Sequence, residues 1–296
     1  MSTMSSISGW RSLLFVPGHV DRYIAGAHKR DADAVILDLE DAVPPSHKPA
    51  ARETLRASIT TVSQRGAAAM VRVNHGIRHL VRDLEAAVVP GLMAVVLPKV
   101  EAAAYVCEVA DALADLEQER GLPAGQVRLV LQIETPGALP ALPAIASAHA
   151  RIIAMTLGPE DFCASLGAEP DKDVLLGPNL AVLHAARAAG LLPLGFVGSI
   201  ADYGDLENFA EVARQARRLG FRGAMVVHPS QVAILNKAFA PTSQELEWAH
   251  RVIQGDALAR EQGRGAFELD GRMIDAPIVR RAQEILGVAR VFKGGR

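Results

Sequence analysis

The sequence predicts an α/β protein built as a (β/α)8 TIM barrel with a C-terminal helical lid segment. The length of 296 residues is close to the ~250 residues of such a barrel plus an added segment. Hydrophobic residues make up 50% of the chain, which is enough to bury a large core. Short apolar runs alternate along the chain with stretches of helical spacing, as in proteins that cover a parallel sheet with helices.

Eight runs of apolar and β-branched residues are each too short for a helix and are closed by Gly, Pro, Asn or an acidic residue. In chain order they cover residues 13–16, 34–37, 70–73, 94–97, 127–133, 152–157, 194–197 and 224–227. Between them lie Ala-, Leu- and Arg-rich stretches such as Ala102–Arg120 and Asp205–Leu219, each long enough to cross from one strand to the next. Each run is therefore predicted to be a strand, and each long stretch between runs a helix.

The apolar runs are nearly continuous rather than alternating, which indicates strands that are buried on both faces. Such strands are typical of a parallel sheet. A doubly wound open sheet is the alternative arrangement. Eight strand-helix units with no GxGxxG after a strand favour closure into a barrel that ends near Phe239.

The pattern changes after Pro241, so we predict a barrel domain over residues 1–240 and a C-terminal segment over residues 241–296. This segment is expected to contain helices at 244–262 and 276–287 and a mobile Gly-rich connector at 263–271, with no strand. Its apolar periodicity is weak. We therefore expect it to pack on the barrel or on a neighbouring subunit.

The charge balance excludes several classes of partner. There are 31 Lys and Arg against 33 Asp and Glu, so no global field attracts a nucleic acid or an anionic membrane. Cys107 and Cys163 form no CxxC and no His/Cys cluster, which argues against disulfides and structural zinc and predicts a cytoplasmic protein. The first apolar run is stopped by Pro17, so we expect neither a signal peptide nor a membrane span, and Met1–Ser8 is expected to be a loose tail.

Polar side chains follow most of the predicted strands. The reacting groups of such barrels stand at the carboxyl ends of the strands, so these side chains are expected to converge. They are Asp38, Glu40 and Asp41 after the second run, Arg72 and Asn74 at the third, Lys99 after the fourth, Glu134 after the fifth, Glu160 and Asp161 after the sixth, and His228 after the eighth. Several carboxylates on one face would repel one another unless a hard divalent cation, most simply Mg²⁺, lay between them. Any one of these acids could instead cap a helix or solvate a loop.

Three of these residues are the main candidates for chemistry. Glu134 is the best metal-ligand candidate, because it follows an apolar run and precedes a Thr-Pro pair that cannot continue the strand. Asp161 is the next, although it or Glu160 could merely cap the following helix. Arg72 lies inside an apolar run, where a guanidinium needs an anionic partner, either the substrate or a structural carboxylate.

Other candidates have simpler interpretations. Cys163 has no obvious His base beside it and is expected to be a small packing residue. His228 could act as a base, yet His-Pro at the end of a strand is equally a turn. The segment Val16–His19 has one glycine and no Walker lysine, so nucleotide hydrolysis is not supported.

Eight sequence blocks in the same order resemble those of the HpcH/HpaI aldolase and citrate lyase beta subunit family. They are RSLLFVPG at 11–18, AVILDLEDAV at 34–43, VRVN at 71–74, LPK at 97–99, QIETP at 132–136, LGPEDF at 157–162, HPSQ at 228–231 and GRMIDAP at 271–277. The opening block and the long C-terminal segment resemble the acyl-CoA lyase branch of that family. This branch includes citryl-CoA, malyl-CoA and citramalyl-CoA lyases.

The resemblance implies a TIM barrel that assembles as a homotrimer or hexamer. It also implies a Mg²⁺ ion, which Mn²⁺ could replace, held by Glu134 and Asp161, with Arg72 binding the oxygens of a small acid. Glu40 and Asp41 would order metal-bound waters. Within the acyl-CoA branch, the aspartate that matches Asp275 reaches the active site of a neighbouring subunit on a lid.

The expected function is magnesium-dependent, reversible carbon-carbon cleavage of a 3-hydroxyacyl-CoA to an acyl-CoA and a 2-oxo acid. Asp275 would deliver a proton to the departing carbon. The coenzyme A phosphates would need Arg11, with Arg22, Arg52 or Arg56 as further candidates. Two alternatives stay open, a malyl-CoA-type thioesterase and a citrate lyase complex beta subunit that acts with an acyl carrier partner.

Overall fold

The computed structural model describes residues 9–201 and 203–294, so the tail expected at Met1–Ser8 lies outside the described residues. The chain divides into two compact units. One spans Trp10–Phe239, and the other begins at Ala240 and contains the C-terminal helices. Each unit is described by itself.

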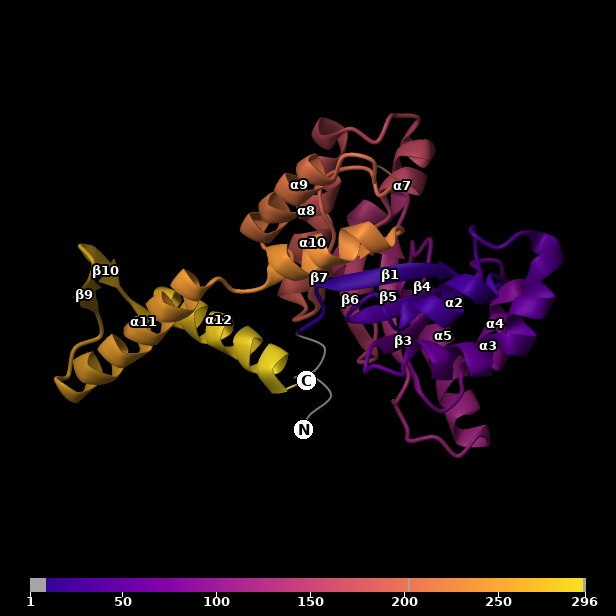
Figure 1. Cartoon of the computed structure of the whole chain (residues 1–296), viewed down its shortest axis with the longest axis horizontal. Coiled ribbons are helices and arrows are strands. Elements are labelled where there is room, and N and C mark those ends of the chain that lie inside the picture. Colours follow the sequence, from indigo (N-terminus) through magenta and orange to yellow (C-terminus); the bar gives the residue numbers. More distant parts are fainter. Residues whose placement is uncertain (1–8, 202, 295–296) are drawn as a thin grey trace. The chain divides into compact units, whose positions relative to one another are not determined.

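The first unit is built on eight parallel strands, as predicted (Figure 1). They are β1 (Ser12–Pro17), β2 (Ala34–Asp38), β3 (Ala68–Arg72), β4 (Leu92–Leu97), β5 (Arg128–Ile133), β6 (Ile152–Leu157), β7 (Leu192–Leu194) and β8 (Ala224–Val226). The strands from β1 to β7 pair in chain order, and β8 pairs with β1. A parallel bridge between Leu194 and Gly223 joins β7 to the start of β8, which confirms the (β/α)8 barrel.

The register of the strands brings their carboxyl ends together. Pro17 at the end of β1 lies opposite Asp38 at the end of β2, and Asp38 lies opposite Arg72 at the end of β3. On the other side, Ile133 of β5 lies opposite Leu157 of β6. The residues that follow these strands therefore meet at one rim of the barrel.

Helices follow the strands and cover the barrel (Figure 1). They are α2 (Asp21–Ala27), α3 (Lys48–Val62), α4 (Ile77–Ala87), α5 (Ala103–Glu119), α6 (Leu142–Ala146), α7 (Pro159–Leu166), α8 (Lys172–Ala188), α9 (Leu206–Leu219) and α10 (Pro229–Phe239), with 3-10 turns at Pro45–His47 and Pro136–Ala141. In α5, Val106, Val109 and Leu113 are buried at helical spacing, which is why this stretch packs on the sheet as a helix. No helix in the described part of the chain is long and apolar enough to span a membrane.

The seventh strand lies earlier than predicted. The expected run was 194–197, but β7 ends at Leu194 because Gly195 takes a left-handed φ of +140° that leaves the strand conformation. Phe196 and Val197 are buried beyond the end of the strand. Hydrophobicity alone did not separate a strand from a buried loop here.

The C-terminal unit also differs from its prediction, which had no strand. Between α11 (Ser243–Glu261) and α12 (Ala276–Gly294), β9 (Phe267–Leu269) and β10 (Arg272–Ile274) form an antiparallel hairpin. Its two-residue turn is Asp270-Gly271, with φ of +52° and +72°, and Asp-Gly favours this left-handed turn. The unit has a small apolar cluster of its own, formed by Ala249, Val252, Ile274, Val279 and Ala282.

A buried ion pair between Glu117 and Arg151 lies near the amino ends of β5 and β6. Glu117 of α5 accepts two hydrogen bonds from Arg151, at 2.9 and 2.7 Å, and two from the backbone N–H groups of Gly125 and Val127, both at 2.7 Å. Burial acts to raise the pKa of Glu117, but these hydrogen bonds and the charge of Arg151 outweigh it and lower the pKa. The carboxylate is therefore a stabilising group only while it is ionised.

We expect Glu117→Gln to reduce the free energy of unfolding by roughly 3 kcal/mol at pH 7, because it leaves the Arg151 guanidinium buried without a charged partner. The folded pKa lies below the unfolded value, so this contribution is complete above about pH 4.5 and is lost as the pH falls through the folded pKa. Urea unfolding at a series of pH values measures it. The exposed Glu119→Gln is the control, and equal stability of the two variants at pH 7 would contradict the role given to Glu117.

Candidate active site

A cavity of about 290 Å³ lies at the rim formed by the carboxyl ends of the strands. Its polar lining includes Asp38, Asp41, Arg72, Gln132, Glu134, Glu160 and Asp161. Its apolar lining includes Phe15, Phe196, Ile200, Met225 and Val227. The cavity thus has an acidic wall, formed by Asp38, Asp41, Glu134, Glu160 and Asp161, and an apolar wall. This composition is expected of a site for a small polar ligand with an apolar portion.

Arg72 at the end of β3 is held by two acids. Its Nε and Nη2 atoms donate to the two carboxylate oxygens of Asp38 at 2.7 Å each, and Nη1 lies 3.1 Å from Oε2 of Glu40. The guanidinium carbon lies 4.7 Å from the centre of the Phe15 ring. Arg72 therefore has a structural carboxylate partner, as one of the two sequence interpretations required, and it also lines the cavity.

The pair of Asp38 and Arg72 stays charged. Burial acts to raise the pKa of Asp38, which is 1% exposed, but the hydrogen bonds and charge of Arg72 outweigh burial and lower it. Burial likewise acts to lower the pKa of Arg72, and the neighbouring carboxylates of Asp38 and Glu40 raise it instead. The guanidinium is thus a permanent, rigidly held cation in the wall of the cavity.

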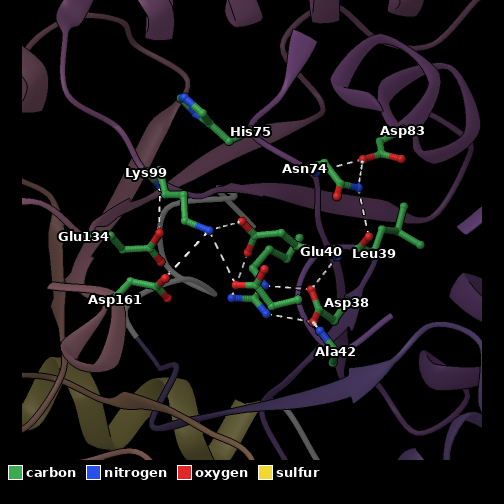
Figure 2. Close-up of polar contacts among 12 residues, drawn as sticks. Asp38, Leu39, Glu40, Ala42, Asn74, His75, Asp83, Lys99, Glu134 and Asp161 are labelled. Carbon is green, nitrogen blue, oxygen red and sulfur yellow. Dashed lines mark hydrogen bonds and ion pairs between the residues drawn. The ribbon is translucent and has the colours of Figure 1, made fainter. Parts of the chain in front are cut away.

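The ammonium group of Lys99 lies near Glu40 and Asp161 (Figure 2), and also near Asp41. The Nζ atom lies 2.8 Å from Glu40, 3.5 Å from Asp41 and 3.8 Å from Asp161. Glu40 is buried, and burial raises its pKa against the opposing effect of Arg72 and Lys99. Among the described residues, its Oε2 atom accepts no hydrogen bond and is paired only with the Arg72 guanidinium, 3.1 Å away.

Glu134 is 2% exposed and follows β5 directly. Its Oε2 atom accepts a hydrogen bond from the backbone N–H of Lys99 at 3.0 Å. Burial, with the negative charges of Glu40 and Asp161, raises the pKa of Glu134 to about 8. Burial and the neighbouring acids thus oppose ionisation of Glu134 more strongly than Arg72 and Lys99 favour it.

Gly158 makes room for Glu134. A Cβ atom at position 158 would lie 2.6 Å from Cγ and 2.7 Å from Oε1 of Glu134, closer than any side chain tolerates. The glycine precedes α7, whose first turn carries Glu160 and Asp161. The backbone after β6 thus approaches the Glu134 carboxyl because residue 158 has no side chain.

The two acids of α7 have different partners. Oε1 of Glu160 accepts hydrogen bonds from the Ser199 hydroxyl at 2.5 Å and the Ile200 N–H at 3.1 Å, so Glu160 holds the loop after β7. Asp161 has a 42% exposed side chain and faces Lys99. The structure thereby gives these two neighbouring acids different roles, and Asp161 is the one that faces the Lys99 ammonium.

Asn74, which the sequence analysis named, belongs to a buried polar network whose other members, Lys48 and Asp83, it missed. The Lys48 ammonium donates to the backbone oxygens of Leu39 and Glu40 at 2.8 Å each and to the side chain of Asn74. Asn74 in turn donates to Asp83 at 2.7 Å. These contacts hold the loop that carries Glu40.

Arg11 does not line this cavity. Arg11 precedes β1, and its guanidinium forms a two-point ion pair with Asp33, with contacts of 2.9 and 2.7 Å, at the amino ends of the strands. Asp275 belongs to the C-terminal unit. Its backbone oxygen accepts from the N–H groups of Ile278 and Val279, so it begins α12.

His228 and Cys163 keep their simpler interpretations. The exposed His228 ring stacks on Tyr203 with centres 4.8 Å apart, and its Nδ1 atom lies 2.7 Å from the Ser230 hydroxyl at the start of α10. Cys163 is buried in α7, and burial raises the pKa of its thiol. A protonated, buried thiol is a packing residue.

Comparison with known proteins decides the family. The family model for HpcH/HpaI aldolase/citrate lyase matches residues 11–229, which include every strand of the barrel. The chain belongs to the HpcH/HpaI aldolase/citrate lyase family. This confirms the resemblance inferred from the eight sequence blocks.

Relatives in this family align over nearly the whole chain. Citrate lyase subunit beta of Leuconostoc mesenteroides subsp. cremoris is 33% identical over 94% of this chain and 93% of its own length. The mitochondrial citramalyl-CoA lyase of Rattus norvegicus is 30% identical over 96% of this chain and 87% of its own.

Solved structures of relatives share the fold. The protein CitE from Mycobacterium tuberculosis, in complex with magnesium, acetoacetate and coenzyme A, has a TM-score of 0.74 and 33% identity over 96% of this chain and 99% of its own. The citrate lyase beta subunit from the same organism, complexed with oxaloacetate and magnesium, has a TM-score of 0.66 and 32% identity over 80% of this chain and 100% of its own.

Arg72 contacts both carboxylate oxygens of Asp38 through its Nε and Nη2 atoms, and this two-point geometry leads to a prediction. Arg72→Lys is expected to reduce kcat/KM about 100-fold while the protein stays folded, because an ammonium supplies one contact where the fork supplies two. Arg72→Met should also lose about 3 kcal/mol of stability, because it leaves Asp38 buried and unpaired. Kinetics and thermal unfolding of both variants test this. Wild-type kcat/KM in Arg72→Lys would show that Arg72 serves only as the structural ion-pair partner of Asp38.

Proposed function

We propose that the protein is a magnesium-dependent lyase that cleaves a 3-hydroxyacyl-CoA to an acyl-CoA and a 2-oxo acid. The observation that carries the proposal is that Glu134 and Asp161 lie with the Arg72 guanidinium in the wall of one cavity. Citramalyl-CoA lyase and citrate lyase subunit beta among the relatives support this reaction class. Magnesium, oxaloacetate and coenzyme A in their solved structures support the ligands.

The donor set fits a magnesium ion. The described residues contain no preformed cluster of three or more His, Cys, Asp or Glu suited to a metal. Mg²⁺ is commonly held by one or two carboxylates and completes its shell with water and substrate oxygens, so Glu134 and Asp161 are sufficient. The raised pKa of Glu134, caused by burial and by the charges of Glu40 and Asp161, supports a site that a cation would stabilise.

When bound, Mg²⁺ supplies Lewis-acid polarisation of the oxygens of the small acid. The protein's own groups do the rest. Arg72 binds and orients the carboxylate of the 2-oxo acid portion and stabilises the charge that develops as the carbon-carbon bond breaks. Its position is fixed beforehand by Asp38, so little reorganisation accompanies the reaction. Glu40 and Asp41 orient waters at the acidic wall.

Cleavage releases the proton of the substrate hydroxyl to water, turns that hydroxyl into the carbonyl of the 2-oxo acid, and leaves the electron pair of the broken carbon-carbon bond on the carbon next to the thioester. Asp275 in its protonated form delivers a proton to that carbon, and in its ionised form removes one in the reverse condensation. A carboxyl group does this well only where water is excluded. We propose that a homotrimer or hexamer supplies such a site, with Asp275 from one subunit acting at the cavity of another.

The decisive experiment incubates the purified protein with citryl-CoA, malyl-CoA and citramalyl-CoA and identifies the products by mass. A lyase gives an acyl-CoA and a 2-oxo acid from at least one thioester, loses activity in EDTA, and regains it with Mg²⁺ or Mn²⁺. Free coenzyme A with intact malate would establish the thioesterase instead. Cleavage only after addition of an acyl carrier partner would establish the subunit of a citrate lyase complex.

A further inference from the structure

Lys99 has an unusual backbone conformation for its position. It follows β4 by two residues and has a φ of +53°, a left-handed conformation that residues with a side chain rarely adopt. In this conformation its N–H points at Oε2 of Glu134 and donates a hydrogen bond of 3.0 Å. Strained backbone of this kind is retained where the surrounding structure or the function requires it.

The side chain of Lys99 lies on the same acids. Its ammonium contacts Glu40 at 2.8 Å, Asp41 at 3.5 Å and Asp161 at 3.8 Å (Figure 2). These acids come from the loops after β2 and β6, and Glu134 comes from the end of β5. One residue therefore contacts four carboxylates from three parts of the rim, through its backbone and its side chain together.

Arg72 does not duplicate this role. Both of its hydrogen bonds to carboxylates go to Asp38, and its remaining close contact is with Glu40. Asp41 and Asp161 have the Lys99 ammonium as their neighbour instead. A lysine ammonium is also a point charge on a flexible stem, which can move aside when another cation enters, whereas the Arg72 fork is locked in place.

We propose that Lys99 is a positioning residue whose ammonium acts as a built-in counterion. It holds the acidic wall together in the metal-free protein and competes with the divalent cation for it. This inference rests on the proposed function. Because Nζ lies 3.8 Å from Asp161, an ion that binds Asp161 has the ammonium as a neighbour. Like charges at such separations repel, so Lys99 lowers metal affinity and keeps the metal exchangeable.

The test is the affinity of the substrate-free protein for Mn²⁺, followed by electron paramagnetic resonance. Lys99→Met removes the ammonium and nearly preserves the length of the chain, and we expect at least fivefold tighter Mn²⁺ binding. Lys99→Arg keeps the positive charge and should stay within twofold of the wild type. Lys99→Gly removes the ammonium but favours the left-handed backbone that serves Glu134, so it should tighten binding as Lys99→Met does.

Lys29→Met is the matched control. Lys29 is exposed just after α2 and does not line the cavity. Unchanged or weaker Mn²⁺ binding in both Lys99→Met and Lys99→Gly would overturn the role of Lys99, while lyase activity of the wild type would leave the proposed function standing. A wild-type protein that binds no Mn²⁺ would overturn both.

Discussion

Glu134→Gln is expected to reduce the rate of carbon-carbon cleavage roughly a thousandfold, which is about 4 kcal/mol of transition-state stabilisation. The amide keeps the size of the side chain and can still accept the N–H of Lys99, but it removes the negative charge that a divalent ion needs. Mn²⁺ affinity should fall together with the rate. Steady-state kinetics at saturating Mg²⁺ and Mn²⁺ titration of the same protein measure the two losses.

Glu101→Gln is the control for this prediction. Glu101 lies near Lys99 in the chain and accepts a hydrogen bond from Thr135 at 2.7 Å, but it does not line the cavity. Its loss should leave kcat within about twofold, since exposed surface changes are usually close to neutral. Full metal affinity and turnover in Glu134→Gln would show that the metal lies elsewhere.

Gly158→Ala tests the geometry of Glu134 without changing any metal donor. The new methyl group would overlap Cγ and Oε1 of Glu134, so the carboxyl must move. We expect a loss of at least about tenfold in kcat/KM, because misplacement of a reacting group by ~1 Å costs as much or more. Gly137→Ala is the control, since a Cβ atom there approaches nothing closer than 4.0 Å. Equal kinetics of the two variants would contradict the close fit.

Asp275→Asn is expected to lower kcat roughly a thousandfold and to leave Mn²⁺ affinity unchanged, because the residue is proposed to move a proton and not to bind the metal. Asp270→Asn is the matched control, in the turn of the β9–β10 hairpin that precedes Asp275. Asp270 is exposed and pairs with Arg251, and asparagine tolerates its left-handed φ of +52°. Near-normal turnover of Asp275→Asn would end its catalytic role and leave it as the residue that begins α12.

Subunit mixing tests where Asp275 acts. Asp275→Asn and Glu134→Gln proteins should each be inactive alone, while mixed oligomers would contain some sites with both wild-type residues. Recovery of activity after demonstrated subunit exchange supports a site shared between subunits. Exchange without recovery would place Asp275 in the same subunit as Glu134 or outside the site.

The sequence by itself determined the barrel and the acidic rim. Continuous apolar runs bounded by Gly, Pro or acids identify strands that are buried on both faces, and this pattern is local. Parallel strands end at one rim, so the placement of Glu134, Asp161 and Arg72 at one cavity followed from their positions after or at the ends of strands. The sequence analysis missed the end of β7 at the buried Gly195 and the Asp-Gly hairpin after Leu269. Both features are determined by backbone conformation and not by hydrophobicity.

Only the tertiary structure decided which acid pairs with which cation. Glu160 and Asp161 are neighbours in sequence, yet one holds the loop after β7 and the other faces Lys99. Arg72 could have bound any anion, and the structure gives it Asp38 across the β2–β3 pair. Ion pairs and the raised pKa of Glu134 depend on the proximity in space of groups that are far apart in the chain. Coulomb energy and desolvation are set by this proximity, which no local sequence pattern encodes.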